Sequence, residues 1–150
     1  MKPNDNLSIS ISREWSQEHA DFVRKQLATY NARHVSEEIR GVYEPISFTL
    51  KDESGQILGG VIGAVKWSYV KIDFLWVDDA LRGQGYGKSL LEEVERKARE
   101  RGCDSIEVDT FSFQAPEFYK KQGFEVVGVV DHAPRGHQHY YLIKKLHVGR

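Results

Sequence analysis

A glycine-rich turn between a predicted strand and a predicted helix carries the strongest chemical signal in this sequence. Residues 82–88 read Arg-Gly-Gln-Gly-Tyr-Gly-Lys, with glycine at alternate positions and a basic residue at each end. Glycines let a backbone approach a ligand closely, and the first amides of a helix have no partners within the helix. These amides, the helix dipole and the basic side chains favour a phosphate or pyrophosphate. The alternative is that the glycines only form a tight turn.

The spacing of the glycines decides which phosphate ligands fit. A Walker A loop requires a glycine at the position that Arg82 occupies, ahead of the Gly87-Lys88-Ser89 triplet. A dinucleotide-binding fingerprint that starts at Gly83 requires its third glycine where this chain has Lys88. Both mismatches argue against ATP, GTP or NAD, and they leave the pattern Arg-x-x-Gly-x-Gly.

This loop closely resembles the acetyl-CoA pyrophosphate loop of the GCN5-related N-acetyltransferase (GNAT) superfamily. Segments 76–78 (Trp-Val-Asp), 109–115 (Asp-Thr-Phe-Ser-Phe-Gln-Ala) and 118–124 (Phe-Tyr-Lys-Lys-Gln-Gly-Phe) look like further signature segments of that family. The resemblance spans roughly residues 45–146 and implies an N-acetyltransferase with acetyl-CoA as cosubstrate. The alternative function is a non-catalytic module that binds or senses acyl-CoA.

By the same resemblance, the strand before the loop carries a bulge and diverges from its neighbour, so that pantetheine pairs with its edge. Backbone amides near Trp76 and Val77 are then expected to bind the thioester oxygen. The residues expected to bind acetyl-CoA are Leu75, Trp76, Val77, Arg82, Gly83, Gln84, Gly85, Tyr86, Gly87, Lys88, Ser89, Ala115, Phe118, Tyr119 and Lys121.

Three residues are candidates for the proton transfers of acetyl transfer. Tyr119 occupies the position where the family places a tyrosine against the coenzyme sulfur, so its hydroxyl is the candidate general acid; the alternative is a core aromatic. Asp73, first, and Asp109, second, are candidate bases for the acceptor amine, each on a central predicted strand. An acid on a strand is also often a hydrogen-bonded structural group, and water can carry the proton away.

The histidines near the C-terminus raise the question of a metal site. His137 and His139 lie two apart on a predicted strand, which places them on one face, but no acid at ligand spacing completes a site with them and His132. We therefore expect no metal. The segment around His137 resembles a loop that lies near the acceptor in one GNAT subgroup, so His137 is a weak candidate for the substrate site.

Composition favours a single domain over residues 1–150. The chain has 21 basic against 22 acidic residues, which gives no reason to expect a nucleic-acid partner. It has no run of membrane-spanning length and no signal peptide, so we expect no membrane partner and a cytoplasmic location. Cys103 is the only cysteine and is expected to be buried. The amine acceptor stays unidentified, and a homodimer is compatible with the exposed edges of such folds.

Hydrophobic periodicity and the family resemblance together predict an α/β fold of the mixed α+β kind. We expect a GNAT-like central mixed, mostly antiparallel sheet of roughly six to seven strands with about four helices. Helices are predicted from Ser16 to about Tyr30, from Lys88 to before Gly102, at Ala115–Gln122 and within Asn31–Tyr43. Strands are predicted at Leu7–Ser12, Ile46–Lys51, Ile57–Trp67, Val70–Val77, Ser105–Thr110, Phe124–Val130 and Gln138–Leu146. Glycines 59, 60 and 63 indicate either a bulge or close backbone approach, or small-residue packing.

Overall fold

A computed structural model of the chain describes residues 7–146. The chain divides into two compact units with the boundary between Glu38 and Ile39. No helix in residues 7–146 is long and apolar enough to cross a membrane.

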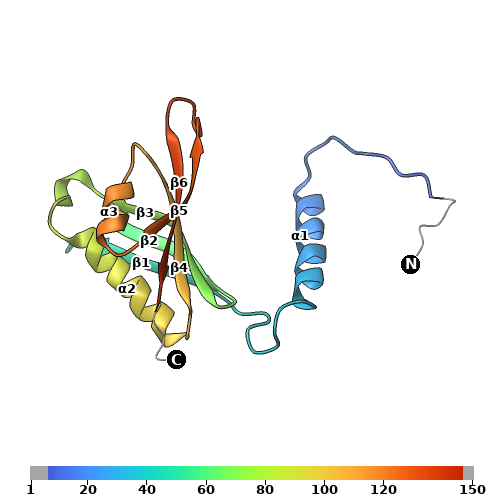
Figure 1. Ribbon diagram of the computed structural model, residues 1–150, viewed down its shortest axis with the longest axis horizontal. Coiled ribbons are helices and arrows are strands. Elements are labelled where there is room, and N and C mark those ends of the chain that lie inside the picture. The colour runs from blue at the N-terminus through green and yellow to red at the C-terminus, as the bar shows by residue number, and fades with distance from the viewer. Residues whose placement is uncertain (1–6, 147–150) are drawn as a thin grey trace. The chain divides into compact units, whose positions relative to one another are not determined.

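The first unit contains helix α1, Gln17–Ala32 (Figure 1). The helix begins as predicted, because the side chain of Ser16 accepts a hydrogen bond from the amide of His19 and so caps its first turn. None of its residues is buried, and its apolar stripe, which includes Phe22 and Leu27, is exposed. The prediction of a strand over Leu7–Ser12 is wrong. Alternation makes a strand only where a neighbouring strand takes up the backbone hydrogen bonds, and no described segment does so there.

The second unit is built on a six-stranded sheet in the order β1-β2-β3-β4-β6-β5 (Figure 1). Every neighbouring pair is antiparallel except β3 with β4, which confirms the predicted mixed, mostly antiparallel sheet. The strands are β1 (Tyr43–Lys51), β2 (Ile57–Lys66), β3 (Tyr69–Val77), β4 (Ser105–Phe111), β5 (Glu125–Asp131) and β6 (Gln138–Lys145).

The helices number slightly fewer than the predicted four. The described residues form three α-helices, α1, α2 (Tyr86–Glu100) and α3 (Pro116–Lys121), together with the short 3₁₀ helix η1 (Asp79–Leu81). The segment between Asn31 and Tyr43 forms turns rather than a second helix. A short segment without an apolar stripe does not repay the cost of nucleating a helix.

Helices α2 and α3 cover one face of the sheet (Figure 1). The apolar stripe of α2 is buried as predicted and packs on alternate residues of the central strands, such as Ile72 and Ile106. Cys103 belongs to the same core, and burial together with the charge of Asp104 raises the pKa of its thiol. The core therefore lies on this face, and the intervening strand residues project from the second face of the sheet.

An ion-pair group ties α2 to β6 and provides a test of stability away from the candidate site. Glu95 lies 3.0 Å from Arg99 and 3.2 Å from Lys144. Burial alone would raise the pKa of Glu95, but the hydrogen bonds from Arg99 and Lys144 outweigh it and hold the pKa below its usual value. The ion pairs therefore contribute stability above the unfolded pKa of about 4.3, and that contribution disappears as the pH falls through the lower folded pKa.

We expect Glu95→Gln to lower the free energy of unfolding by roughly 0.5–1 kcal/mol at pH 7, because the ion pairs are lost. The deficit relative to wild type should vanish at acid pH, measured by denaturant unfolding from pH 7 to pH 3. Glu92→Gln is the control, since within the described residues Glu92 makes no hydrogen bond or salt bridge. An equal loss in both variants at every pH would contradict the assignment.

Candidate active site

Strand β3 carries a bulge in the middle of the sheet. Its pairing with β2 shifts register between Ile62 and Gly63, which pair with Phe74 and Ile72 and leave Asp73 as the extra residue. A side chain at Gly63 would collide with the backbone oxygen of Lys71. Of the two interpretations left open for the glycines of β2, Gly63 therefore marks a bulge, and the bulge redirects β3 just before Leu75, Trp76 and Val77.

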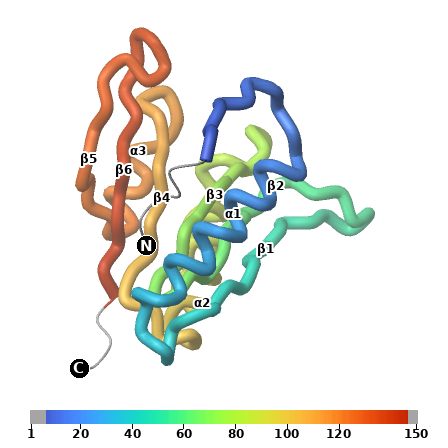
Figure 2. Tube along the Cα trace, turned by 90° about the vertical axis from the view of Figure 1, so that its right-hand side faces the viewer, coloured from blue at the N-terminus to red at the C-terminus, as the bar shows by residue number. Residues whose placement is uncertain are grey.

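Strands β3 and β4 diverge beyond their first residues. They pair only where Tyr69–Lys71 meet Ser105–Glu107, at one end of both strands, and Figure 2 shows them separating from there. Past Lys71, β3 has a hydrogen-bonded strand neighbour only on its β2 side within residues 7–146. Half of the peptide groups in this part of β3 consequently face the gap without a strand partner. An extended, amide-containing ligand can pair with such an edge.

The glycine-rich turn follows β3 and the short helix η1 and leads to the N-terminus of α2. Gly83 and Gly85 have φ of +78° and +84°, values that side chains rarely adopt, and Gly85 is the N-cap of α2. No side chain caps the helix, so its first amides are free to bind an anion. The helix begins at Tyr86, two residues before the predicted start at Lys88.

The third glycine of the turn has a packing role. A Cβ atom at Gly87 would lie 3.0 Å from the ring of Phe118, so glycine lets α3 approach the first turn of α2. Phe118, which is predicted to bind acetyl-CoA, is thus brought to the end of the glycine-rich turn. Sequence spacing predicted a ligand at this glycine but not the contact between the two helices.

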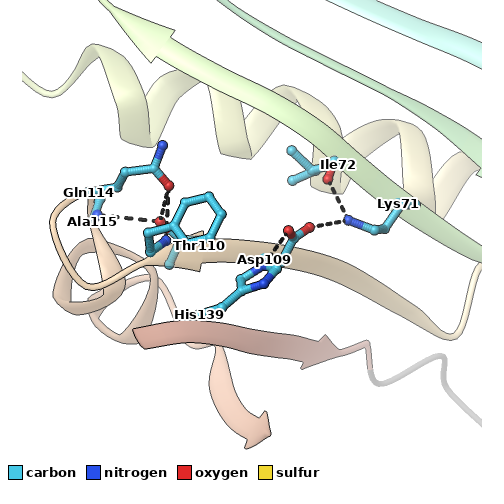
Figure 3. Close-up of polar contacts among 8 residues, drawn as sticks. Lys71, Ile72, Asp109, Thr110, Gln114, Ala115 and His139 are labelled. Carbon is cyan, nitrogen blue, oxygen red and sulfur yellow. Dashed lines mark hydrogen bonds and ion pairs between the residues drawn. The ribbon is translucent and has the colours of Figure 1, made fainter. Parts of the chain in front are cut away.

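The loop between β4 and α3 is held by the side chain of Gln114. Its Oε1 atom accepts hydrogen bonds from the hydroxyl of Thr110 at 3.1 Å and from the amide of Phe111 at 2.9 Å (Figure 3). The amide of Ala115 donates to the Thr110 hydroxyl at 3.4 Å. These bonds fix where α3 begins and therefore where Tyr119 lies.

Tyr119 is 4% exposed and packs against Phe118 and Phe124, with ring centroids 5.3 and 5.6 Å away. Burial, with the negative charge of Asp109 adding to it, raises the pKa of Tyr119 to about 12. The hydroxyl is thus protonated at neutral pH, and within residues 7–146 it donates to no other group. Tyr119 is a core aromatic, and it also retains a proton that a ligand can receive.

Asp109 joins two basic side chains on the second face of the sheet (Figure 3). One carboxylate oxygen lies 2.6 Å from Nζ of Lys71 on β3, and the other lies 2.7 Å from Nε2 of His139 on β6. Partial burial would raise the pKa of Asp109, but these two hydrogen bonds outweigh it and hold the pKa below its usual value. Asp109 is therefore ionised and bonded through both oxygens at the place where β3 and β4 begin to diverge.

The other predicted site residues are less closely connected. Asp73 is exposed at the bulge and, in the described part of the chain, makes no hydrogen bond or ion pair. His137 packs edge-on against Phe113, with ring centroids 4.9 Å apart. Residues 7–146 contain no group of three or more side chains arranged to hold a metal ion.

Sequence reasoning considered His139 only as a metal ligand and missed its contact with Asp109. The antiparallel pairing of β4 with β6 places His139 opposite Phe111 and beside Asp109. The one signal in the sequence was the spacing of His137 and His139, which predicted a shared face but gave no information about the neighbouring strand.

Five rings lie near Asp109, opposite it or farther along β4 and the β6 end, and we call them the aromatic strip: Phe111, Phe113, His137, His139 and Tyr141. The rings of Phe111 and Phe113 are parallel within 2°, and His139 lies 4.5 Å from Phe111 and 4.4 Å from Tyr141. Phe113 and Tyr141 are exposed. The strip offers exposed aromatic rings next to a carboxylate, which suits a planar or cationic group.

Comparisons with known proteins agree with this geometry. A model of the Acetyltransferase (GNAT) family matches residues 11–124. Blasticidin-S acetyltransferase of Streptomyces morookaense is 39% identical over 95 residues, 63% of this chain and 70% of its own length. An acetyltransferase of Agrobacterium fabrum is 28% identical over 139 residues, 93% of this chain and 99% of its own length. The crystal structure of an acetyltransferase from Bacillus cereus superposes with a TM-score of 0.85 and 39% identity, over 91% of this chain and 98% of that one.

Proposed function

Because this chain belongs to the GNAT family of acetyltransferases, which use acetyl-CoA, we propose that it transfers the acetyl group directly to an amine of a small, basic molecule. The family membership makes it an N-acetyltransferase.

The free edge of β3 is the observation that carries the proposal. It runs from the bulge at Asp73 to the glycine-rich turn and has no strand partner on the β4 side. Pantetheine would pair with this edge through Leu75, Trp76 and Val77, and the pyrophosphate would meet the amides that follow Gly85. The remaining expected contacts come from Arg82, Gly83, Gln84, Tyr86, Gly87, Lys88, Ser89, Ala115, Phe118, Tyr119 and Lys121.

Direct transfer follows from the nucleophiles that are available. An acetyl-enzyme intermediate requires an activated thiol, hydroxyl or amine, and the one cysteine is buried with its pKa raised. In direct transfer the neutral amine forms its bond to the thioester carbon, backbone amides of β3 stabilise the oxyanion, and the bond from carbon to sulfur then breaks. The hydroxyl of Tyr119 would donate its proton to the leaving thiolate.

The second face of the sheet indicates the class of acceptor. Asp109 and Asp73 place negative charge beside the divergence of β3 and β4, and the aromatic strip offers a stacking surface beside it. A cationic amine attached to a planar group matches both features. Blasticidin-S acetyltransferase bears the name of a small-molecule acceptor, which supports the same class for this chain.

Initial-rate kinetics test the direct route. Before the kinetics, acetyl-CoA at about 100 times its Kd should stabilise the fold by roughly 2.7 kcal/mol. A panel of small basic amines, blasticidin S included, should then yield a substrate. Double-reciprocal plots against both substrates should intersect, and acetyl-CoA alone should leave no acetyl group on the protein. Parallel plots would contradict direct transfer. Binding of acetyl-CoA with no turnover of any amine would instead favour the non-catalytic module.

A further inference from the structure

We propose that Nδ1 of His139 accepts the proton of the acceptor ammonium and that Asp109 positions the imidazole for this step. The inference rests on the proposed function, because it assigns the base for the same amine. It starts from the bond between Nε2 of His139 and the carboxylate of Asp109, at 2.7 Å. It adds a catalytic residue on β6 to a site otherwise drawn from β3, the glycine-rich turn and α3.

The hydrogen bond fixes the tautomer of the neutral ring. Both oxygens of the ionised Asp109 carboxylate can only accept, and Lys71 already donates to the other oxygen at 2.6 Å. Nε2 must therefore carry the hydrogen in its bond to Asp109, which leaves the lone pair of the neutral imidazole on Nδ1. In the part of the chain that the structure describes, no residue donates to Nδ1. The basic nitrogen is thus available to a ligand.

The position of the ring is suitable for an acceptor amine. His139 lies opposite Phe111 in the β4–β6 register, farther from the last β3–β4 pair than Asp109. The side chain is 17% exposed, so it is shielded from bulk water but reachable. Phe111 and Tyr141 flank the ring at 4.5 and 4.4 Å, which holds its plane in the aromatic strip.

The groups that face His139 come from β3, β4, β5 and β6 itself. Strand β4 brings Asp109, which bonds to the ring directly, and strand β3 brings Lys71, whose charge the same carboxylate balances. On β5 the residue opposite His139 is the uncharged Val130. On β6 itself the neighbouring ring is Tyr141. Among the described residues, Asp109 is therefore the one negative group in contact with the ring that receives the proton.

The proton balance of the reaction closes with these assignments. The acceptor ammonium gives one proton to Nδ1 of His139, and the neutral amine attacks the thioester carbon. Collapse of the tetrahedral intermediate breaks the bond from carbon to sulfur, and the thiolate receives the proton of Tyr119. The nitrogen of the new amide then loses its second proton to the phenolate oxygen of Tyr119, which becomes a neutral hydroxyl again. His139 then releases its proton to water, so that one proton leaves per turnover, as the net reaction of an ammonium requires.

The kinetic test compares His139→Gln and Asp109→Asn with wild type across pH 5 to 10. Wild type should show a limb of kcat/KM for the amine that rises with pH as the base loses its proton. His139→Gln should lose that limb and fall about 100-fold or more in kcat at pH 7.5, while the Kd for acetyl-CoA stays within about twofold. Asp109→Asn should shift the limb and lower kcat, because the positioning carboxylate is lost. His132→Asn, on the loop after β5, is the matched control and should behave as wild type.

A histidine NMR experiment gives a result that does not require turnover. Above the titration of the ring, nitrogen-15 shifts should show hydrogen on Nε2 and none on Nδ1 in wild type, and Asp109→Ala should lose that preference. Hydrogen on Nδ1 would overturn the proposal whether or not an acceptor has been found, and so would an unchanged rate limb in His139→Gln. Failure of the proposed function is distinct from both: it would appear as wild type that binds acetyl-CoA and acetylates no amine.

Discussion

Gly85→Val should weaken acetyl-CoA binding by about 100-fold or more, or about 2.7 kcal/mol, with the fold retained. The φ of Gly85 is +84°, and an added Cβ would meet no protein atom within 4 Å, so the new side chain projects into space that we assign to the pyrophosphate. The isopropyl group would block the free amides of α2. Isothermal titration with acetyl-CoA measures the effect.

Backbone strain by itself would also lower stability, so the experiment needs a matched glycine. Gly55, in the turn between β1 and β2, has φ of +88° and likewise no atom within 4 Å of an added Cβ. Both valine variants should lose about 1 to 2 kcal/mol of folding free energy, or about 2–8 °C in Tm. Only Gly85→Val should lose acetyl-CoA. Equal binding by both variants would refute the pyrophosphate loop.

Tyr119→Phe should lower kcat by about 100-fold and leave the Kd for acetyl-CoA within about twofold. With its pKa raised to about 12, the Tyr119 hydroxyl keeps its proton at every working pH, so the role proposed for it is donation to the thiolate as the bond from carbon to sulfur breaks. Phenylalanine fills the same space between Phe118 and Phe124 and removes only that donor. Single-turnover kinetics with a saturating amine measure the chemical step.

Tyr69→Phe is the control for removing a phenolic hydroxyl. Burial, followed by the charge of Glu107, raises the pKa of Tyr69 as well, but this residue lies at the start of β3, where β3 and β4 are still paired. The kcat of Tyr69→Phe should equal that of wild type. Unchanged turnover in Tyr119→Phe, with Tyr69→Phe also unchanged, would leave Tyr119 as a core aromatic alone.

Features that depend only on consecutive residues could be predicted from the sequence. The alternating glycines predicted the turn that places Gly85 before α2, and the apolar spacing from Leu90 to Ala98 predicted the buried face of that helix. Ser16 predicted the start of α1. Each of these depends on backbone angles, caps and periodicity within one or two turns of chain, which neighbouring side chains fix.

Features that need two distant segments were not predictable in the same way. Alternation suggested a strand at Leu7–Ser12, but no described strand pairs with it. Glycines 59, 60 and 63 left a bulge and simple packing equally open until the β2–β3 register assigned Gly63 to the bulge. Asp109 was chosen as a base by its type and strand, and the structure adds that both of its oxygens are already bonded.

The sequence alone determined the family, the glycine-rich turn before α2 and the presence of a tyrosine at position 119, because these are properties of short contiguous segments. Tertiary structure decided that Lys71, Asp109 and His139 meet, across separations of 38 and 30 residues along the chain. That meeting depends on the registers of β3, β4 and β6, and a register is set by the packing of whole strands against the core on the other face. No local sequence pattern indicates which residues of distant strands will meet.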